Sequence, residues 1–382
     1  MWNTDPRTTR RKEPVSSTMK AQTRKKKPVF VVAVASVVVA ALVSSYCWWN
    51  TNLFGADSFC GGRMESGEVQ AALDSTGRVS QVYAQVDPQR AEFECTVERT
   101  SRFVGGDDQQ LTVETGIEEG VFPFTTHVWK NPAARSYFRG GVTGAVSQDS
   151  GYVVLPKPCW GKGGALEGKG ITRFEDGALA TVEAKMDKGV ADPAGLARLL
   201  TRSARQVAEK AGCGTAALSA DPDLAAPSAS RATDIQNVCG VRGFALPKEA
   251  VIVARAEPDV EQVNDGSADT WACDLHLAGS AKAAVSFSVT SDKNFVEVAK
   301  KDIRDAETLP GNKGVARSDQ AVLRCGSGDV HFATKWNTAY DGALIDSLHR
   351  DSAAYAKVKK AAFQNFLDAT AAARSCPRVT IS

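Results

Sequence analysis

The chain has 382 residues, of which 43% are hydrophobic and 24% are charged, and its net charge is +2. This length exceeds what one hydrophobic core usually supports, and the composition excludes a mainly disordered chain, a collagen-like chain and a multi-span membrane protein. The near-neutral charge gives no reason to expect a nucleic acid as partner. We therefore expect two folded units with appendages, and the nine cysteines are the unusual feature of the composition.

The first 49 residues are expected to anchor the chain in a membrane. Residues 1–27, predicted to be a disordered basic cytoplasmic tail, hold nine basic and two acidic residues, so residues 50–382 carry a net charge of −5. The apolar run over residues 28–49 would be about 33 Å long as a helix, which spans a bilayer. The basic residues before it and the aromatic residues Tyr46, Trp48 and Trp49 at its end predict a single-pass plasma membrane protein. Its N-terminus is then cytoplasmic and its bulk is extracytoplasmic.

A cleaved secretory signal is the alternative to this signal-anchor. We prefer the anchor because the apolar run is longer than a usual signal core and no small-residue cleavage site ends it. Cys47 lies near the end of the run, but Tyr46 stands where the lipobox of a lipoprotein needs a small residue. We expect a free thiol there, which could link two chains as a homodimer.

The other eight cysteines form two sets with similar spacing. Cys60, Cys95, Cys159 and Cys213 are separated by 35, 64 and 54 residues, and Cys239, Cys273, Cys325 and Cys376 by 34, 52 and 51. An aromatic residue, Phe93 or Trp271, stands two places before the second cysteine of each set. These agreements predict a tandem duplication with a period of about 165–180 residues, with domain 1 at residues 50–213, a mobile linker at 214–233 and domain 2 at 234–382.

Each domain is expected to be α+β, an antiparallel sheet packed with helices. Strands are predicted at residues 79–86, 111–115, 251–256 and 284–290, and a short helix at 69–73. An amphipathic helix closes each domain; in the first, Asp192 caps the helix, Pro193 begins it and Gly212 ends it. The Asp-Gly pairs at residues 176–177 and 341–342 predict hairpin turns.

Four cysteines per extracytoplasmic domain predict disulfides rather than a metal site, because no two of them are close in sequence. Four cysteines allow three connectivities, and the sequence does not select among them. We favour first to second and third to fourth, which are Cys60–Cys95, Cys159–Cys213, Cys239–Cys273 and Cys325–Cys376. Each of these bridges closes a loop of about 35 to 55 residues, worth roughly 4 kcal/mol in the chain-entropy model.

The context of the first cysteine resembles a group of actinobacterial cell-envelope lipoproteins. Their domains open with a cysteine, a helix with a run similar to residues 68–73 (EVQAAL), and a second cysteine on a strand, here Cys95. Thr96 stands where those proteins have an aromatic residue, and the second unit lacks the helix run. The resemblance implies an antiparallel sheet flanked by helices, as in the fold shared by the Mog1 and PsbP proteins.

No catalytic signature emerges from the sequence, and we expect no catalytic residue, cofactor or metal. Residues 163–169 have the spacing of a phosphate-binding loop, but Gly170 replaces the hydroxyl residue that such a loop needs. The four histidines are scattered, and Ser327 near His331 lacks an evident third partner.

Basic and aromatic residues are the candidates for a binding surface. They are Arg173 and Phe174 in the first unit, Lys335 and Trp336 in the second, and Phe122, Phe124 and Trp129 within residues 121–131. Residues 121–131 could be a loop that docks a partner, but an ordinary strand is the preferred interpretation. A cation beside a ring suits acidic wall polymers or a protein partner, but an alternating strand with its ring in the core is the preferred interpretation. We expect a non-catalytic envelope module that binds a protein or a cell-wall component. The alternative is an envelope hydrolase with a site in only one domain.

Overall fold

The computed structural model describes residues 26–53, 55–74, 77–100, 108–119, 131–160, 178–218, 221–251, 258–266, 269–303 and 306–381. Helix α1 (Lys26–Asn50) contains the predicted apolar run. Its segment Phe30–Trp48 has a mean hydropathy of 2.3, and none of it is buried. This helix is long and apolar enough to cross a membrane. The predicted disordered tail lies outside the described residues, apart from the last two positions, which begin α1.

The first eight-stranded sheet is antiparallel throughout, with the order β10-β6-β7-β8-β9-β5-β4-β3. Its strands are β3 (Arg78–Val86), β4 (Phe93–Thr100), β5 (Gln109–Glu119), β6 (Ser136–Arg139), β7 (Gly144–Val146), β8 (Ser150–Val154), β9 (Ala178–Lys188) and β10 (Asp223–Ala225). The other elements of this part are β1 (Ser58–Phe59), η1 (Cys60–Gly62), β2 (Met64–Glu65), α2 (Ser66–Ala72), η3 (Pro132–Ala134), η4 (Lys157–Cys159), α3 (Pro193–Ala211) and η5 (Ala216–Leu218).

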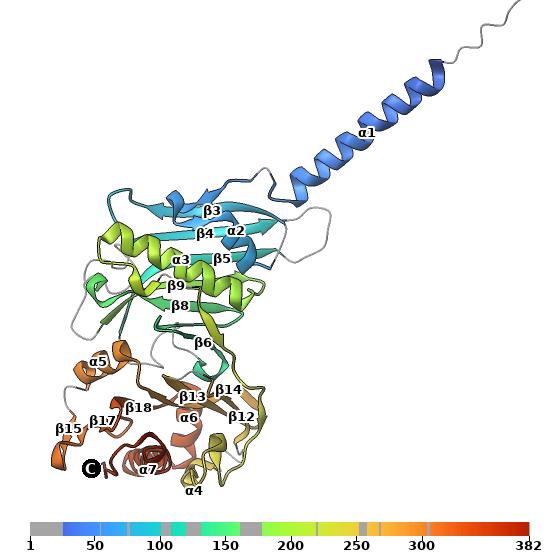
Figure 1. The fold of residues 1–382 in the computed structure, drawn as a ribbon. Coiled ribbons are helices and arrows are strands. Elements are labelled where there is room, and N and C mark those ends of the chain that lie inside the picture. The colour runs from blue at the N-terminus through green and yellow to red at the C-terminus, as the bar shows by residue number, and fades with distance from the viewer. Residues whose placement is uncertain are drawn as a thin grey trace, which may run out of the picture. The chain divides into compact units, whose positions relative to one another are not determined.

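The second eight-stranded sheet has the order β11-β12-β13-β14-β18-β17-β16-β15 and is also antiparallel. Its strands are β11 (Arg231–Ala232), β12 (Pro258–Asn264), β13 (Thr270–Leu277), β14 (Ser280–Thr290), β15 (Glu307–Leu309), β16 (Gly314–Ala316), β17 (Gln320–Cys325) and β18 (Gly328–Trp336). The other elements are η6 (Val238–Gly240), α4 (Lys248–Val251), α5 (Lys293–Asp302), η7 (Pro310–Asn312), α6 (Thr338–Ser347), α7 (Ser352–Thr370) and η8 (Ala372–Arg374). The chain is therefore α+β (Figure 1).

The two sheets have the same topology once β10 and β11 are set aside. In each sheet, the first three strands in sequence form one meander and the next four form a second meander. The last strand of the second meander pairs with the last strand of the first, which joins β9 to β5 and β18 to β14. The first cysteine of each set has left-handed backbone, with φ of 57° at Cys60 and 62° at Cys239. Its N–H donates to a side chain of the first long strand, Gln81 Oε1 at 2.8 Å or Glu261 Oε2 at 2.7 Å. Shared topology and shared local geometry support the duplication inferred from the cysteine spacing.

The disulfides join the cysteines in the order that we favoured from the sequence. Cys60 is bonded to Cys95, Cys159 to Cys213, Cys239 to Cys273 and Cys325 to Cys376. In each repeat the first bridge ties the entry loop to the second long strand. The second bridge ties η4, which follows β8, or the end of β17 to the segment that follows the closing helix. Both ends of each repeat are therefore fastened by a disulfide.

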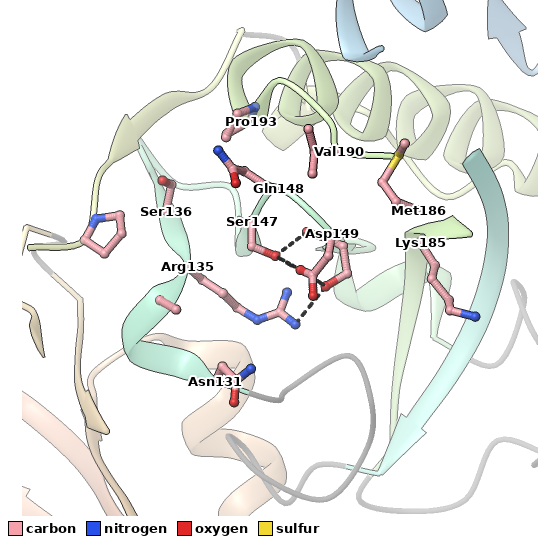
Figure 2. Close-up of a pocket in the computed structure, with 13 residues that line it drawn as sticks. Asn131, Arg135, Ser136, Ser147, Gln148, Asp149, Lys185, Met186, Val190 and Pro193 are labelled. Atoms are coloured by element: carbon pink, nitrogen blue, oxygen red, sulfur yellow. Dashed lines mark hydrogen bonds between the residues drawn. The ribbon is translucent and has the colours of Figure 1, made fainter. Parts of the chain in front are cut away.

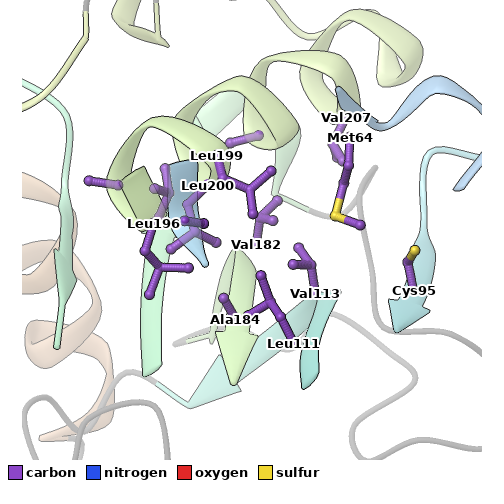
Figure 3. Close-up of a cluster of buried hydrophobic side chains, with 14 of the residues drawn as sticks. Met64, Cys95, Leu111, Val113, Val182, Ala184, Leu196, Leu199, Leu200 and Val207 are labelled. Atoms are coloured by element: carbon purple, nitrogen blue, oxygen red, sulfur yellow. The ribbon is translucent and has the colours of Figure 1, made fainter. Parts of the chain in front are cut away.

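Helices α2 and α3 cover one face of the first sheet (Figure 1). Leu196, Leu199 and Leu200 of α3 are fully buried in a core with Val113 and Val182 (Figure 3). The predicted ends of α3 are confirmed. The Asp192 side chain accepts a hydrogen bond from Gly195 N at 2.6 Å, and Gly212 has the positive φ of 62° that ends the helix.

Gly195 also lets α2 and α3 approach closely. A Cβ atom built on it would lie 2.1 Å from Ala71 O, which is a backbone atom of α2. The contact between these helices therefore depends on the absence of a side chain at this position.

The structure corrects one predicted hairpin turn and the first residue of one predicted strand, whereas the Asp-Gly pair at 176–177 lies outside the described residues. The Asp-Gly pair at 341–342 lies inside α6 rather than in a hairpin turn, because Asn337 caps the helix by accepting from Tyr340 N at 2.9 Å. Asp341 then falls in the first turn, where an acidic side chain favours the helix. The strand predicted at 251–256 begins with the last residue of α4, and its remainder lies outside the described residues.

Two short parts of the predicted linker pair with strands of the sheets. β10 pairs with β6 in the first sheet, and β11 pairs with β12 in the second. This part of the connection therefore extends both sheets.

In each repeat, the connection between the third and fourth strands packs against the other repeat. Element η3 of the first repeat contacts β12, β13 and β14 of the second. Ala133 N donates to Asp274 Oδ2 at 3.0 Å. Reciprocally, Phe295 and Val298 of α5 join a cluster with Tyr152 on the first sheet. The exchange makes the two repeats one packed body.

Candidate functional site

A cleft of about 700 Å³ opens at one end of the first sheet (Figure 2). Small-molecule sites are commonly clefts of about 300–1,000 Å³. The lining comes from the segment that leads into β6, the turn between β7 and β8, the end of β9 and the turn into α3. The lining residues are Asn131, Ala134, Arg135, Ser136, Ser147, Gln148, Asp149, Ser150, Lys185, Met186, Val190, Pro193 and Pro227.

The turn between β7 and β8 is fixed by backbone hydrogen bonds. Ser147 N donates to Ser150 O at 2.7 Å, which closes the turn around Gln148 and Asp149. The carbonyl of Asp149 accepts from Met186 N, and that of Gln148 accepts from Ala191 N, both at 2.8 Å. The turn is therefore tied to β9 and to the entry into α3, and its side chains are presented from a rigid support.

Asp149 is the centre of a hydrogen-bonded network in the cleft (Figure 2). The hydroxyl of Ser150 donates to Asp149 Oδ1 at 3.1 Å, and the hydroxyl of Ser147 donates to the same oxygen. Arg135 Nη2 in turn donates to Ser150 Oγ at 3.2 Å. The guanidinium of Arg135 lies 5.8 Å from the centre of the Tyr152 ring, and the residue is only 3% exposed. The network links β6 to the β7–β8 turn.

The network also sets the charge of Asp149. Burial acts to raise the pKa of this carboxyl, but hydrogen bonds from Ser147 and Ser150 and the charge of Arg135 outweigh it and lower the pKa. Asp149 therefore stays ionised at neutral pH and is a weak base. It can accept hydrogen bonds and orient the two hydroxyls, which suits recognition of a polar group.

The rim of the cleft combines a cation with apolar side chains. Lys185 is largely exposed and forms an ion pair with Asp187 at 3.1 Å. Val190 is 56% exposed, and Met186 lines the cleft beside Lys185. A ligand with both apolar and hydrogen-bonding groups would find complementary side chains here.

The equivalent turn of the second repeat has a different chemistry. Residues 317–320 repeat the backbone bonds, with Arg317 N donating to Gln320 O at 2.7 Å and Thr334 N donating to Asp319 O at 2.8 Å. Asp319 corresponds to Asp149, but its partner is Arg317 from the same turn, with Nε 3.5 Å from Oδ1. Gln320 stands at the position of Ser150. The hydroxyl pair that holds Asp149 is therefore specific to the first repeat.

A second pocket, of about 300 Å³, lies at one end of the second sheet. Its lining residues are Asp265, Asp269, Thr270, Trp271, Ser291, Ser327, Val330 and Arg374. His331 does not line it. The ring of His331 is fully buried, with Nε2 3.1 Å from Gln320 Oε1, and burial lowers its pKa to about 3. Ser327 and His331 therefore do not face a common cleft.

The residues predicted to form a binding surface divide into two groups. Phe122, Phe124, Trp129, Arg173 and Phe174 lie outside the described residues. Lys335 is exposed on β18, whereas Trp336 is 1% exposed and packs edge-on against Tyr340 with ring centres 4.9 Å apart. Trp336 is thus a core residue, as the alternating-strand interpretation predicted, and its inclusion in a binding surface is corrected.

The cleft residues of the first repeat were not singled out from the sequence. Their signal was weak, because a Ser-Gln-Asp-Ser segment is typical of any exposed turn. Within the part of the chain that the structure describes, no group of three or more His, Cys, Asp or Glu side chains could hold a metal ion.

The chain matches no protein-family model, no curated protein and no solved structure.

Proposed function

We propose that this chain is a membrane-anchored binding protein of the cell envelope. In this proposal α1 crosses the plasma membrane, the basic N-terminus is cytoplasmic and residues 50–382 are extracytoplasmic. The apolar helix, the basic residues that precede it and the four disulfides support this arrangement, because disulfides persist in oxidising compartments.

The cleft around Asp149 is the proposed binding site, and its ligand is a polar segment of an envelope protein or of a cell-wall component. The difference between the two repeats carries this proposal. Both repeats build the same turn, but in the second an arginine of the turn pairs with the aspartate. In the first, two serines and the buried Arg135 hold the aspartate at the edge of a cleft.

A non-catalytic role fits the lowered pKa of Asp149. A general acid or base works best when its pKa is near the working pH, and the pKa of Asp149 is shifted the other way. Its two serine partners donate to the carboxylate, which orients their hydroxyls, and a carboxylate with a lowered pKa is a weak general base. The resemblance to envelope lipoproteins and to the Mog1 and PsbP fold remains part of the proposal. It is supported by the antiparallel sheet packed with helices in each repeat.

Site-specific photocrosslinking in the native envelope tests the binding site. A photoreactive phenylalanine analogue replaces Gln148, at the tip of the turn in the cleft, and Ser318 at the matching place of the second repeat is the control. We expect an adduct with a protein or wall fragment at residue 148 and little at residue 318, identified by mass spectrometry. Equal adducts at both positions, or none at either, would refute a specific site in the first repeat.

A further inference from the structure

The β3 edge of the first sheet differs from the equivalent edge of the second sheet, which is the outer edge of β12. In the second repeat, residues 228–232 cover strand β12: Arg231 and Ala232 pair with Glu261 and Val260, and Ser228 N donates to Val263 O at 2.9 Å. These residues precede the first cysteine of their repeat, Cys239, by 11 to 7 positions. The edge is thereby closed by the chain itself.

The same positions of the first repeat are occupied by the end of the proposed anchor. Counting back from Cys60 by 11 to 7 positions gives residues 49–53, and α1 ends at Asn50. These residues do not form a strand. Asn52 Oδ1 accepts from Val79 N at 3.2 Å, and Arg78 Nη1 donates to Trp48 O at 3.0 Å. Among the described residues, no strand pairs with the outer edge of β3.

The side chains of β3 suit a lipid interface. Arg78 is its only charged residue, although the exterior as a whole carries an excess of acidic side chains. Val82 is the extra residue of a bulge opposite β4 and is 53% exposed, and Tyr83 is 45% exposed. Leu53, three residues after the end of α1, is 73% exposed. Tyrosine and tryptophan favour the membrane interface, and an unprotected edge strand with apolar side chains invites a cover.

The connection between the apolar segment and the folded exterior is short. Asn50 is 6% exposed, so the folded exterior begins within three residues of Cys47, at most about 11 Å along the chain. Trp48 is half exposed, and the guanidinium of Arg78 lies 5.0 Å from the centre of its ring. A tryptophan at the end of a membrane span and an arginine beside it both suit the layer of phospholipid headgroups.

We propose that the β3 edge, defined by Trp48, Leu53, Arg78, Val82 and Tyr83, rests in the headgroup layer of the membrane that holds α1. Phospholipid then covers β3 in the first sheet, as β11 covers β12 in the second sheet. This inference rests on the proposed membrane anchoring, and it adds a surface at which domain 1 meets the bilayer.

Fluorescence quenching in vesicles tests the proposal on the full chain. A single reporter cysteine is placed by Val82→Cys in a Cys47→Ser background, labelled with an environment-sensitive dye, and reconstituted into phosphatidylcholine–phosphatidylglycerol vesicles that carry a headgroup-attached quencher. Val260→Cys on β12, at the covered edge, is the matched control, and unchanged thermal unfolding shows that each variant is folded. We expect quenching at residue 82 to be at least about twofold that at residue 260, because a side chain in the headgroup layer lies within about 10 Å of the quencher.

The outcomes separate the two proposals. If the protein floats with the vesicles but quenching is equal at the two positions, the contact between β3 and lipid is wrong while the anchoring stands. If the label at residue 82 is instead self-quenched between copies, a second chain covers the edge and the lipid proposal is overturned. If the protein does not float with the vesicles, the anchoring itself fails.

Discussion

Phe295 provides the most direct test of how the two repeats are joined. It lies on α5, which follows β14 and precedes β15 in the second repeat. Its side chain nevertheless packs in a cluster with Tyr137, Tyr152 and Leu179 of the first sheet. Phe295 is 2% exposed. Truncation of a buried phenylalanine to alanine removes apolar contact and leaves a cavity, at a cost of about 3–5 kcal/mol. We expect Phe295→Ala to lower the stability of the joined repeats by this amount.

The next residue of the same helix is the matched control. Val296 is 5% exposed but packs with Ala299, Ile303 and Val322, which belong to its own repeat. Val296→Ala removes two carbon atoms, and we expect a loss of about 2 kcal/mol within the second repeat. The two variants therefore differ in which contact they weaken, although they change adjacent positions.

Urea unfolding of the oxidised full chain in detergent, followed by tryptophan fluorescence and by circular dichroism, is the assay. We expect Phe295→Ala to separate the unfolding of the two repeats, so that the two probes no longer coincide, whereas Val296→Ala leaves them coincident. The reasoning is refuted if Phe295→Ala costs less than about 1 kcal/mol, well below the range for a buried phenylalanine. It is also refuted if both variants unfold in the same way.

Three further predictions concern stability and association. Since burial lowers the pKa of His331 from 6.5 to about 3, its neutral form stabilises the fold above pH 6.5, and this contribution is lost as the pH falls toward 3. We expect His331→Gln to remove about 3–5 kcal/mol of that pH dependence in chemical unfolding, and an unchanged acid profile would contradict the buried neutral ring. Gly195→Ala should destabilise by about 1–3 kcal/mol because its Cβ would meet the backbone of α2, whereas Gly67→Ala, with open space around it, should be neutral or slightly stabilising in thermal unfolding. If Cys47 links two chains, Cys47→Ser abolishes a dimer band on a non-reducing gel of membranes, and persistence of that band excludes this cysteine as the link.

The sequence alone determined the features that depend on spacing and on local chemistry. Two similar sets of four cysteine positions predicted the duplication, and the loop lengths that they close favoured the pairing that the structure has. The ends of α3 were predictable because Asp192 and Gly212 act on the backbone within a few residues. The apolar run of α1 was predictable from composition and length.

Only the tertiary structure decided which residues that are distant in the sequence come together. Asp149 and Arg135 are 14 positions apart and meet because β6, β7 and β8 fold into adjacent strands. The exchange of η3 and α5 joins residues separated by more than 100 positions, as in the bond from Ala133 to Asp274. Neither arrangement leaves a periodic signal, because hydrophobic periodicity reports that a face is buried and does not identify its partner. The Asp-Gly pair at 341–342 shows the same limit, since the cap at Asn337 and the burial of Tyr340 selected a helix over a turn.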